Sequence, residues 1–220
     1  MTPYYESKLG KLYHGDCLEI MPELEPVDLV LTDPPYGIGE DGGLKARYRQ
    51  GDGRTKGVQK YQKMNWDSKR PPKRVFELIK KTPFYIIFGG NYFADLLPPS
   101  PGWLYWDKQL GGDFSDGELI YTNKKMGLRS FSIHTFSGLR GGKDRKHPTQ
   151  KPIALVIWCI GFFKGTQTIL DPFIGSGTTA IACERLNRRW IGIEISEKYC
   201  EIAAKRIESE ASQLKLWASK

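Results

Sequence analysis

The tetrapeptide at residues 33–36, Asp-Pro-Pro-Tyr, has the groups needed to activate an amine. The Asp33 carboxylate and the Pro34 carbonyl can each accept a hydrogen bond from one NH₂ group. Two such bonds draw the nitrogen from planar toward tetrahedral, so its lone pair becomes nucleophilic. The Tyr36 ring can stack on an extruded base, and we expect the ring to matter more than the hydroxyl. The alternative is a rigid turn with a buried tyrosine.

A second candidate site is the segment 168–179, Thr-Ile-Leu-Asp-Pro-Phe-Ile-Gly-Ser-Gly-Thr-Thr, which has the pattern strand, acidic tip, glycine turn and helix. Gly175 and Gly177 would let the backbone pass close to a ligand. Glu194 follows 19 residues after Gly175 and can accept hydrogen bonds from ribose hydroxyls. The other candidates supply hydroxyls, helix caps, a carboxylate or a ring: Ser176, Thr178, Thr179, Asp171 and Phe173.

The turn lacks the GxxxxGK[ST] pattern that cradles phosphates, so the expected ligand is an adenosine without a phosphate chain. The alternative is a structural strand-to-helix turn followed by a surface glutamate.

The elements expected to position these residues alternate along the chain. Apolar runs predict strands at 11–14, 27–32, 84–88, 103–106, 119–122, 129–135, 168–170 and 190–193. Helices are expected at 17–21, 73–81, 91–97, 152–163, 176–186 and from 197 to about 214. This order predicts an α/β fold with a doubly wound, mostly parallel sheet and helices on both faces. A length of 220 residues fits a single domain, 1–220.

The composition argues against three classes of protein: membrane-spanning proteins, secreted proteins, and proteins built around zinc or disulfides. No apolar run approaches the roughly 20 residues that span a bilayer, and the first residues do not form a secretory signal, so we expect a cytoplasmic protein and no membrane partner. Four scattered cysteines without a CxxC pair argue against a zinc site or a disulfide framework, so no metal is expected. The net charge of +8 favours a polyanionic partner.

The two motifs together resemble those of the amino-methyltransferase family, which modifies adenine at N6 or cytosine at N4 in DNA. The likeness rests on Asp-Pro-Pro-Tyr at 33–36 and Asp-Pro-Phe-Ile-Gly-Ser-Gly at 171–177, in the permuted order of the β group. Three further segments agree: Tyr-His-Gly-Asp-Cys-Leu-Glu at 13–19, Lys-His-Pro-Thr-Gln-Lys-Pro at 146–152 and Arg-Trp-Ile-Gly-Ile-Glu-Ile at 189–195. The resemblance covers about residues 12–207.

The resemblance implies that a methyl group passes directly from S-adenosyl-L-methionine to the amine, without a covalent enzyme intermediate. It makes Asp33, Pro34, Pro35 and Tyr36 catalytic. The cofactor contacts that it implies, taken with those of the glycine turn, are Asp16, Cys17, Asp33, His147, Thr149, Lys151, Asp171, Phe173, Gly175, Ser176, Gly177, Thr178 and Glu194.

The partner that the resemblance implies is double-stranded DNA. The region that reads the target in this family is here only the insert 109–145, so specificity must come from that insert, from the basic loop 37–70 or from a second subunit. With many charges and few apolar anchors, loop 37–70 is predicted to be mobile without DNA. We expect phosphate contacts from Arg47, Arg49, Arg54, Arg140 and Lys143, although solvated loops would have the same composition.

Adenine is the first choice of base, because enzymes of this family that act on cytosine N4 more often carry Ser in place of Asp33. Three alternatives stay open: cytosine N4, an RNA or protein amine, and a catalytically silent DNA-binding subunit on a methyltransferase fold. A homodimer and a cognate restriction nuclease are open as partners.

Overall fold

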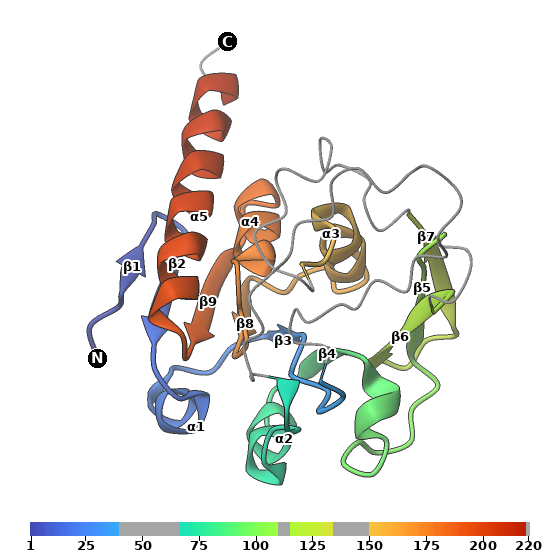
Figure 1. Ribbon diagram of the computed structural model, residues 1–220. Coiled ribbons are helices and arrows are strands. Elements are labelled where there is room, and N and C mark those ends of the chain that lie inside the picture. Colours follow the sequence, from blue (N-terminus) through green and yellow to red (C-terminus); the bar gives the residue numbers. More distant parts are fainter. Residues whose placement is uncertain (40–66, 110–114, 134–149, 219–220) are drawn as a thin grey trace, which may run out of the picture.

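The computed structural model describes residues 1–39, 67–109, 115–133 and 150–218, with side chains described up to residue 213. Nine strands of these ranges form one sheet (Figure 1). The strands are β1 (Tyr5–Glu6), β2 (Gly10–His14), β3 (Leu29–Thr32), β4 (Phe84–Phe88), β5 (Trp103–Asp107), β6 (Gly117–Thr122), β7 (Arg129–Ser132), β8 (Thr168–Asp171) and β9 (Arg189–Glu194). The helices are α1 (Cys17–Ile20), α2 (Lys73–Ile79), α3 (Ile153–Gly161), α4 (Thr178–Arg185) and α5 (Glu197–Ala218), with short 3₁₀ turns η1 (Met21–Glu23) and η3 (Gly90–Phe93).

The strand order is β1-β2-β9-β8-β3-β4-β6-β5-β7. The strands β2, β9, β8, β3 and β4 run parallel, while β6 is antiparallel to both β4 and β5. The predicted doubly wound, mostly parallel sheet is confirmed. The two-residue strand β1 was not expected from the sequence, because it is too short to show a pattern.

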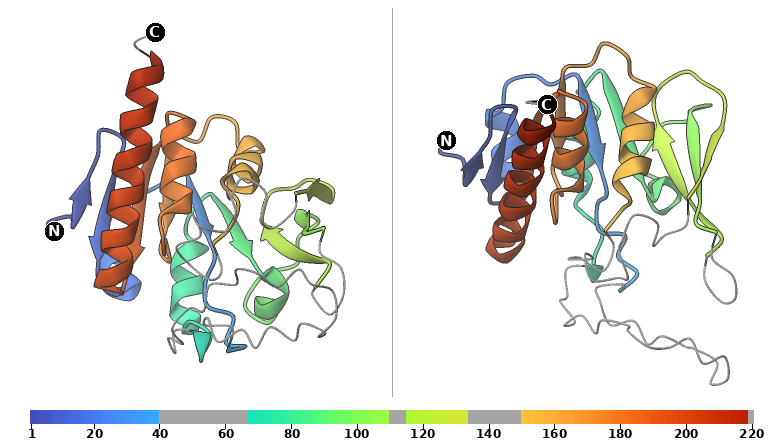
Figure 2. Two further views of the ribbon diagram at one scale, coloured as in Figure 1. Left: turned by 45° about the horizontal axis from the view of Figure 1, so that its top comes forward. Right: turned by 90° about the horizontal axis from the view of Figure 1, so that it is seen from above.

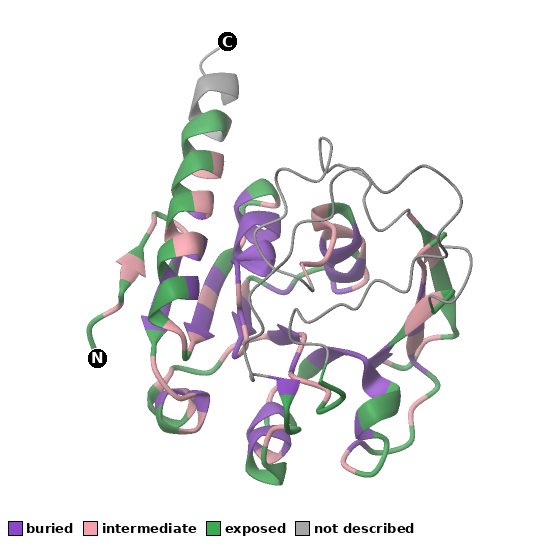
Figure 3. Cartoon of the chain, in the orientation of Figure 1, coloured by how far each residue is buried: buried purple, intermediate pink, exposed green. Residues whose placement is uncertain are grey.

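The residues of the central strands alternate between two hydrophobic cores, as the pleat requires. Leu29 and Leu31 of β3 pack into the core under α3, α4 and α5, whereas Val30 packs into the core over α1 and α2. Figure 2 shows these two helix groups on opposite faces of the sheet. The central strand β3 is buried along its whole length (Figure 3).

Two helix predictions need correction. The helix expected at 91–97 is only the 3₁₀ turn η3, which begins directly after Gly89, with φ +62°, and already ends at Phe93. The helix expected from residue 176 begins at Thr178, since Gly177 stands before it with φ +85°.

The strands β3 and β8 are neighbours, but the chain leaves them in opposite directions, toward β4 and β9 respectively. This divergence is the topological switch point, where doubly wound sheets bind their ligands beyond the carboxyl ends of the strands. Asp33 follows β3 and Asp171 ends β8, so the fold places both acids there. No helix in the described ranges is long and apolar enough to cross a membrane.

Candidate active site

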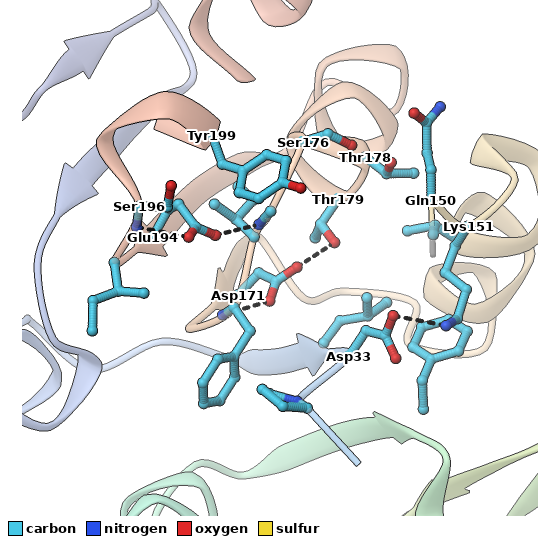
Figure 4. Close-up of a pocket in the computed structure, with 18 residues that line it drawn as sticks. Asp33, Gln150, Lys151, Asp171, Ser176, Thr178, Thr179, Glu194, Ser196 and Tyr199 are labelled. Atoms are coloured by element: carbon cyan, nitrogen blue, oxygen red, sulfur yellow. Dashed lines mark hydrogen bonds and ion pairs between the residues drawn. The ribbon is translucent and has the colours of Figure 1, made fainter. Parts of the chain in front are cut away.

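A cavity of about 410 Å³ opens at the switch point (Figure 4). This volume is within the range of small-molecule sites, roughly 300–1,000 Å³. The cavity joins the two motifs that the sequence singled out. Its walls are formed by Leu31, Asp33, Pro35, Phe88, Gln150, Lys151, Val156, Asp171, Phe173, Ile174, Gly175, Ser176, Thr178, Thr179, Glu194, Ile195, Ser196 and Tyr199.

Asp171 organises the glycine turn from inside the protein. Its Oδ2 accepts a hydrogen bond from Thr179 Oγ1 at 2.6 Å, and its Oδ1 accepts from Thr32 Oγ1 at 2.9 Å and from the Phe173 amide at 3.1 Å. Burial nevertheless raises the pKa of Asp171 to about 7, although these hydrogen bonds favour the charged form. The carboxyl therefore ties the two strands β3 and β8 and the helix α4 together, and it titrates near neutral pH.

The turn departs from the sequence prediction in its capping. No side chain caps α4: Gly177 occupies the N-cap position, while Thr179 donates to Asp171. A Cβ on Gly177 would lie 3.2 Å from the Cβ of Ala203 on α5. The glycine is needed for its positive φ and for close helix packing; it does not line the cavity, and the approach of its backbone to a ligand stays a prediction.

Arg206 of α5 fixes the same turn, a role that no local sequence pattern indicates. Its Nη1 donates to the Ser176 carbonyl and, at 2.8 Å, to Ser176 Oγ. Burial lowers the pKa of Arg206 to about 10, which leaves it charged at neutral pH. The cation thus holds the tip of the turn against the last helix.

Glu194 ends β9 beside the turn, and two backbone amides orient its carboxylate. Oε2 accepts from the Gly175 amide at 3.0 Å and Oε1 from the Ser196 amide at 2.9 Å. Burial raises the pKa of Glu194, opposed by these amides. Each oxygen keeps a further lone pair, and the carboxylate lines the cavity, so it can accept the hydroxyl hydrogens of a ribose.

On the other side of the cavity, Asp33 belongs to a polar cluster that we call the Asp33 cluster. Its five members are Asp33, Tyr36, Lys108, Glu118 and Lys151. Lys151 Nζ lies 2.7 Å from Asp33 Oδ2, and the Tyr36 hydroxyl lies 2.5 Å from Asp33 Oδ1. Burial is the largest effect on the pKa of Asp33 and raises it, opposed by Lys151.

The Tyr36 ring is less open than the sequence suggested. It stacks on Tyr92, with the ring centroids 4.7 Å apart and the planes at 15°, and it packs against Gly89. One face is therefore occupied by an aromatic ring. The hydroxyl has two carboxylate partners, which the sequence did not indicate; that the ring matters more than the hydroxyl stays a prediction.

The structure places some candidates away from the cavity walls. Asp16 caps α1, its side chain accepting from the Leu18 amide at 2.8 Å, and Cys17 is buried, which raises the pKa of its thiol to about 12. Both follow the end of β2, next to β9, but neither lines the cavity. Several candidates lie outside the described residues: His147, Thr149, Arg47, Arg49, Arg54, Arg140 and Lys143, with most of loop 37–70 and much of the insert 109–145.

Among the residues of the site that the sequence prediction missed are Lys108, Glu118, Tyr199 and Arg206. All lie outside the recognisable motifs.

In the described part of the chain, no group of three or more metal-binding side chains is placed to hold a metal ion. The four cysteines are free and buried.

A doubly wound sheet with this glycine turn, an acid ending the following strand and an Asp-Pro-Pro-Tyr turn across one cavity defines a methyltransferase of the α/β class. Comparisons with known proteins indicate which methyltransferases this chain resembles. Residues 122–205 match the model of the N6_N4_Mtase family, described as DNA methylase. The Type II methyltransferase M2.DpnII of Streptococcus pneumoniae is 26% identical, over 94% of this chain and 93% of its own length.

The Type II methyltransferase M.ScaI of Streptomyces caespitosus is 29% identical, over 96% of this chain and 86% of its own length. The crystal structure of the M1.HpyAVI–SAM complex superposes with a TM-score of 0.60 and 26% identity, covering 90% of this chain and 99% of that one. These comparisons support the resemblance of the chain to the DNA amino-methyltransferase family.

Proposed function

We propose that this protein transfers a methyl group from S-adenosyl-L-methionine to the N6 amine of adenine in DNA. One observation carries the proposal: a single cavity is lined both by the acids of the glycine turn, Asp171 and Glu194, and by Asp33 and Pro35 of the tetrapeptide. A methyl donor held by the first group would present its methyl to an amine held by the second.

The residues present fit the donor. S-adenosyl-L-methionine carries a positive sulfonium and an ammonium group, and the cavity wall holds three carboxyl groups, those of Asp33, Asp171 and Glu194. Glu194 is oriented for ribose hydroxyls, and Phe173 and Ile195 give apolar surface for an adenine ring. The M1.HpyAVI structure was solved with SAM, which supports the assignment.

The chemistry follows from the position of Asp33. A carboxylate that accepts a hydrogen bond from the amine draws the nitrogen toward tetrahedral, and its lone pair attacks the methyl carbon. The carbon–sulfur bond breaks with its electron pair on sulfur, which leaves S-adenosylhomocysteine with an uncharged thioether sulfur. The methylated nitrogen then releases one proton, and Asp33, whose pKa burial raises, is the nearest acceptor.

Adenine is favoured over cytosine because the first residue of the tetrapeptide is Asp33, whereas enzymes of this kind that act on cytosine N4 more often carry the neutral serine there. An ionised acceptor forms hydrogen bonds roughly twice as strong as a neutral one. The base would leave the duplex to reach the cavity, as enzymes acting on base atoms require. A homodimer, a cognate restriction nuclease and a cytoplasmic location stay predictions.

Long-read sequencing tests this function. The protein and its Asp33→Ala variant would be expressed in a host without its own DNA methylation. We expect modified adenines at one short sequence with the wild type and none with the variant. Modified cytosines instead of adenines would reassign the base, and unmodified DNA from an expressed, folded wild type would contradict the proposal.

Binding of the methyl donor is expected to tighten as the pH rises through about 7. In the protein without ligand, the pKa of Asp171 is about 7, so its carboxyl holds a proton below that pH. Because the pKa is raised in the folded state, ionising this carboxyl as the pH rises lowers the folding stability. A cationic ligand favours the ionised form and lowers this pKa, so affinity rises as the pH approaches about 7 and levels off above it. Calorimetry between about pH 6 and pH 8 would measure it. Asp171→Asn is the control, because the ligand's own titration remains; equal pH slopes in both proteins would contradict the prediction.

The basic loop should supply part of the DNA affinity. Replacing Arg47, Arg49 and Arg54 together by alanine is expected to weaken DNA binding and flatten its salt dependence, while affinity for the methyl donor stays unchanged. Each phosphate contact contributes about 0.9 to the slope of log K against log salt, so three contacts would lower it by roughly 2.7.

The matched control replaces three exposed lysines at the opposite edge of the sheet, Lys81, Lys125 and Lys164. These adjoin the amino ends of β4 and β8 and the carboxyl end of β6. The same charge is removed there, so a purely global electrostatic effect would flatten both slopes equally and would contradict a role for the loop.

A further inference from the structure

The Asp33 cluster extends beyond the tetrapeptide through a glutamate. Glu118 lies at the start of β6, which is antiparallel to β4, so it reaches the edge where β3 and β4 end. Glu118 Oε1 is 3.2 Å from Lys151 Nζ, and Glu118 Oε2 is 3.1 Å from Lys108 Nζ. The Glu118 side chain is only 9% exposed and that of Lys151 only 10% exposed. Two carboxylates and two ammonium groups balance their charges.

The Tyr36 hydroxyl has fewer protons to donate than it has carboxylate acceptors within reach. Tyr36 has one hydroxyl proton, but two carboxylate oxygens lie within reach: Asp33 Oδ1 at 2.5 Å and Glu118 Oε1 at 2.9 Å. Lys151 donates to both carboxylates and points its remaining proton toward the Tyr36 oxygen, at 3.4 Å. The hydroxyl can therefore serve only one carboxylate at a time.

The tyrosine ring itself is held in place. Tyr92 stacks on one face, and a Cβ on Gly89 would lie 2.4 Å from two of its ring carbons. Because the ring is fixed, switching between the two acceptors needs only rotation of the hydroxyl hydrogen about the C–O bond.

We propose that the Tyr36 hydroxyl is a two-position donor, which caps Asp33 when no base is bound and turns to Glu118 when the target amine donates to Asp33. This inference rests on the proposed function and assigns Glu118 as a positioning residue for it. The turn frees a lone pair of Asp33 for the amine while the buried phenol stays hydrogen-bonded. An unpaired buried hydroxyl would otherwise oppose binding of the base.

The same contacts set the charge of Asp33. The groups facing it are Lys151 before α3, Glu118 on β6, Tyr36 on its own turn and Asp171 on β8, while Lys108 after β5 faces Glu118. Burial raises the pKa of Asp33; the negative charge of Glu118 raises it further, whereas Lys151 and the Tyr36 hydrogen bond lower it. Removing Glu118 or the hydroxyl should thus shift this pKa in opposite directions.

Two variants and their combination test the proposal. Glu118→Gln keeps the shape but is a weaker, uncharged acceptor, so the hydroxyl stays on Asp33, and kcat should fall about tenfold with unchanged affinity for the methyl donor. Tyr36→Phe keeps the ring and removes the proton. In the double variant, the loss should be close to that of Tyr36→Phe alone, because Glu118 acts through the hydroxyl.

The pH profile of kcat/KM separates this role from a structural one. Its acid limb should move to lower pH in Glu118→Gln and to higher pH in Tyr36→Phe. The half-exposed Glu77, on α2, gives the matched control Glu77→Gln, which should move neither limb. Thermal melting would show that each variant folds, and Tyr36→Phe, which loses a single oxygen, keeps the test valid if Glu118→Gln unfolds.

The outcomes are distinguishable. Independent losses in the double variant, or acid limbs that stay in place, would overturn the two-position donor while wild-type activity upheld the proposed function. A wild-type protein that transfers no methyl group to DNA would overturn the proposed function and this inference with it.

Discussion

Replacing Asp33 by alanine is expected to abolish methyl transfer to DNA while the protein remains folded. The variant loses the carboxylate that accepts the amine hydrogen bond, and losing a preorganised electrostatic partner of a reacting group typically costs at least about a hundredfold in rate. Asp33 is 24% exposed, and its partner Lys151 keeps Glu118 at 3.2 Å, so both ammonium groups of the cluster still contact a carboxylate, which they share. A labelled methyl donor would measure transfer.

Glu77→Ala removes a half-exposed carboxylate from α2 and serves as the control for this variant. Its activity should equal that of the wild type. Full activity in Asp33→Ala would contradict the role of Asp33, and the amine acceptor would then have to be sought elsewhere on the cavity wall.

Replacing Glu194 by alanine is expected to weaken binding of S-adenosyl-L-methionine by about 1.5–3 kcal/mol, the usual loss for a hydrogen bond to a charged group. This corresponds to roughly ten- to hundredfold in Kd. The variant also removes the acceptor of the Gly175 and Ser196 amides, so part of the loss reflects a looser glycine turn. Calorimetry without DNA isolates the binding step.

Glu194→Gln separates the two contributions, because its amide oxygen can still accept from one backbone amide. Glu197→Ala, three residues further along and exposed, is the matched control. An affinity unchanged in Glu194→Ala would remove this carboxylate from the donor site.

The parallel core of the fold follows from local sequence patterns. Runs such as 84–88 are apolar and bounded by glycine, and the acids that follow β3 and β8 belong to recognisable motifs. Because parallel strands end at one edge, those acids could be expected to meet. The structure places Asp33 and Asp171 around one cavity.

The antiparallel part of the site could not be found in this way. Glu118 reaches Asp33 only because β6 pairs antiparallel with β4 in the register Phe88↔Ile120, and Lys108 joins it because β5 pairs with β6. Neither register has a local signal, and the two residues belong to no motif. Pairing between distant segments decides such contacts.

Packing between distant helices explains the other differences. Gly177 and Arg206 both connect the glycine turn to α5, one by leaving room for Ala203 and the other by binding Ser176. A motif identifies the turn but not the helix that covers it. The packing of Gly177 against Ala203 and the hydrogen bond between Arg206 and Ser176 could therefore be recognised only in the folded chain.

The most direct test of the central claim is the identity of the methylated base. Unmethylated DNA would be incubated with the protein and S-adenosyl-L-methionine carrying a deuterated methyl group, then digested to nucleosides and analysed by mass spectrometry. The proposed function predicts deuterium-labelled N6-methyladenine, absent from the Asp33→Ala reaction. Labelled N4-methylcytosine, or label in the Asp33→Ala product, would contradict it.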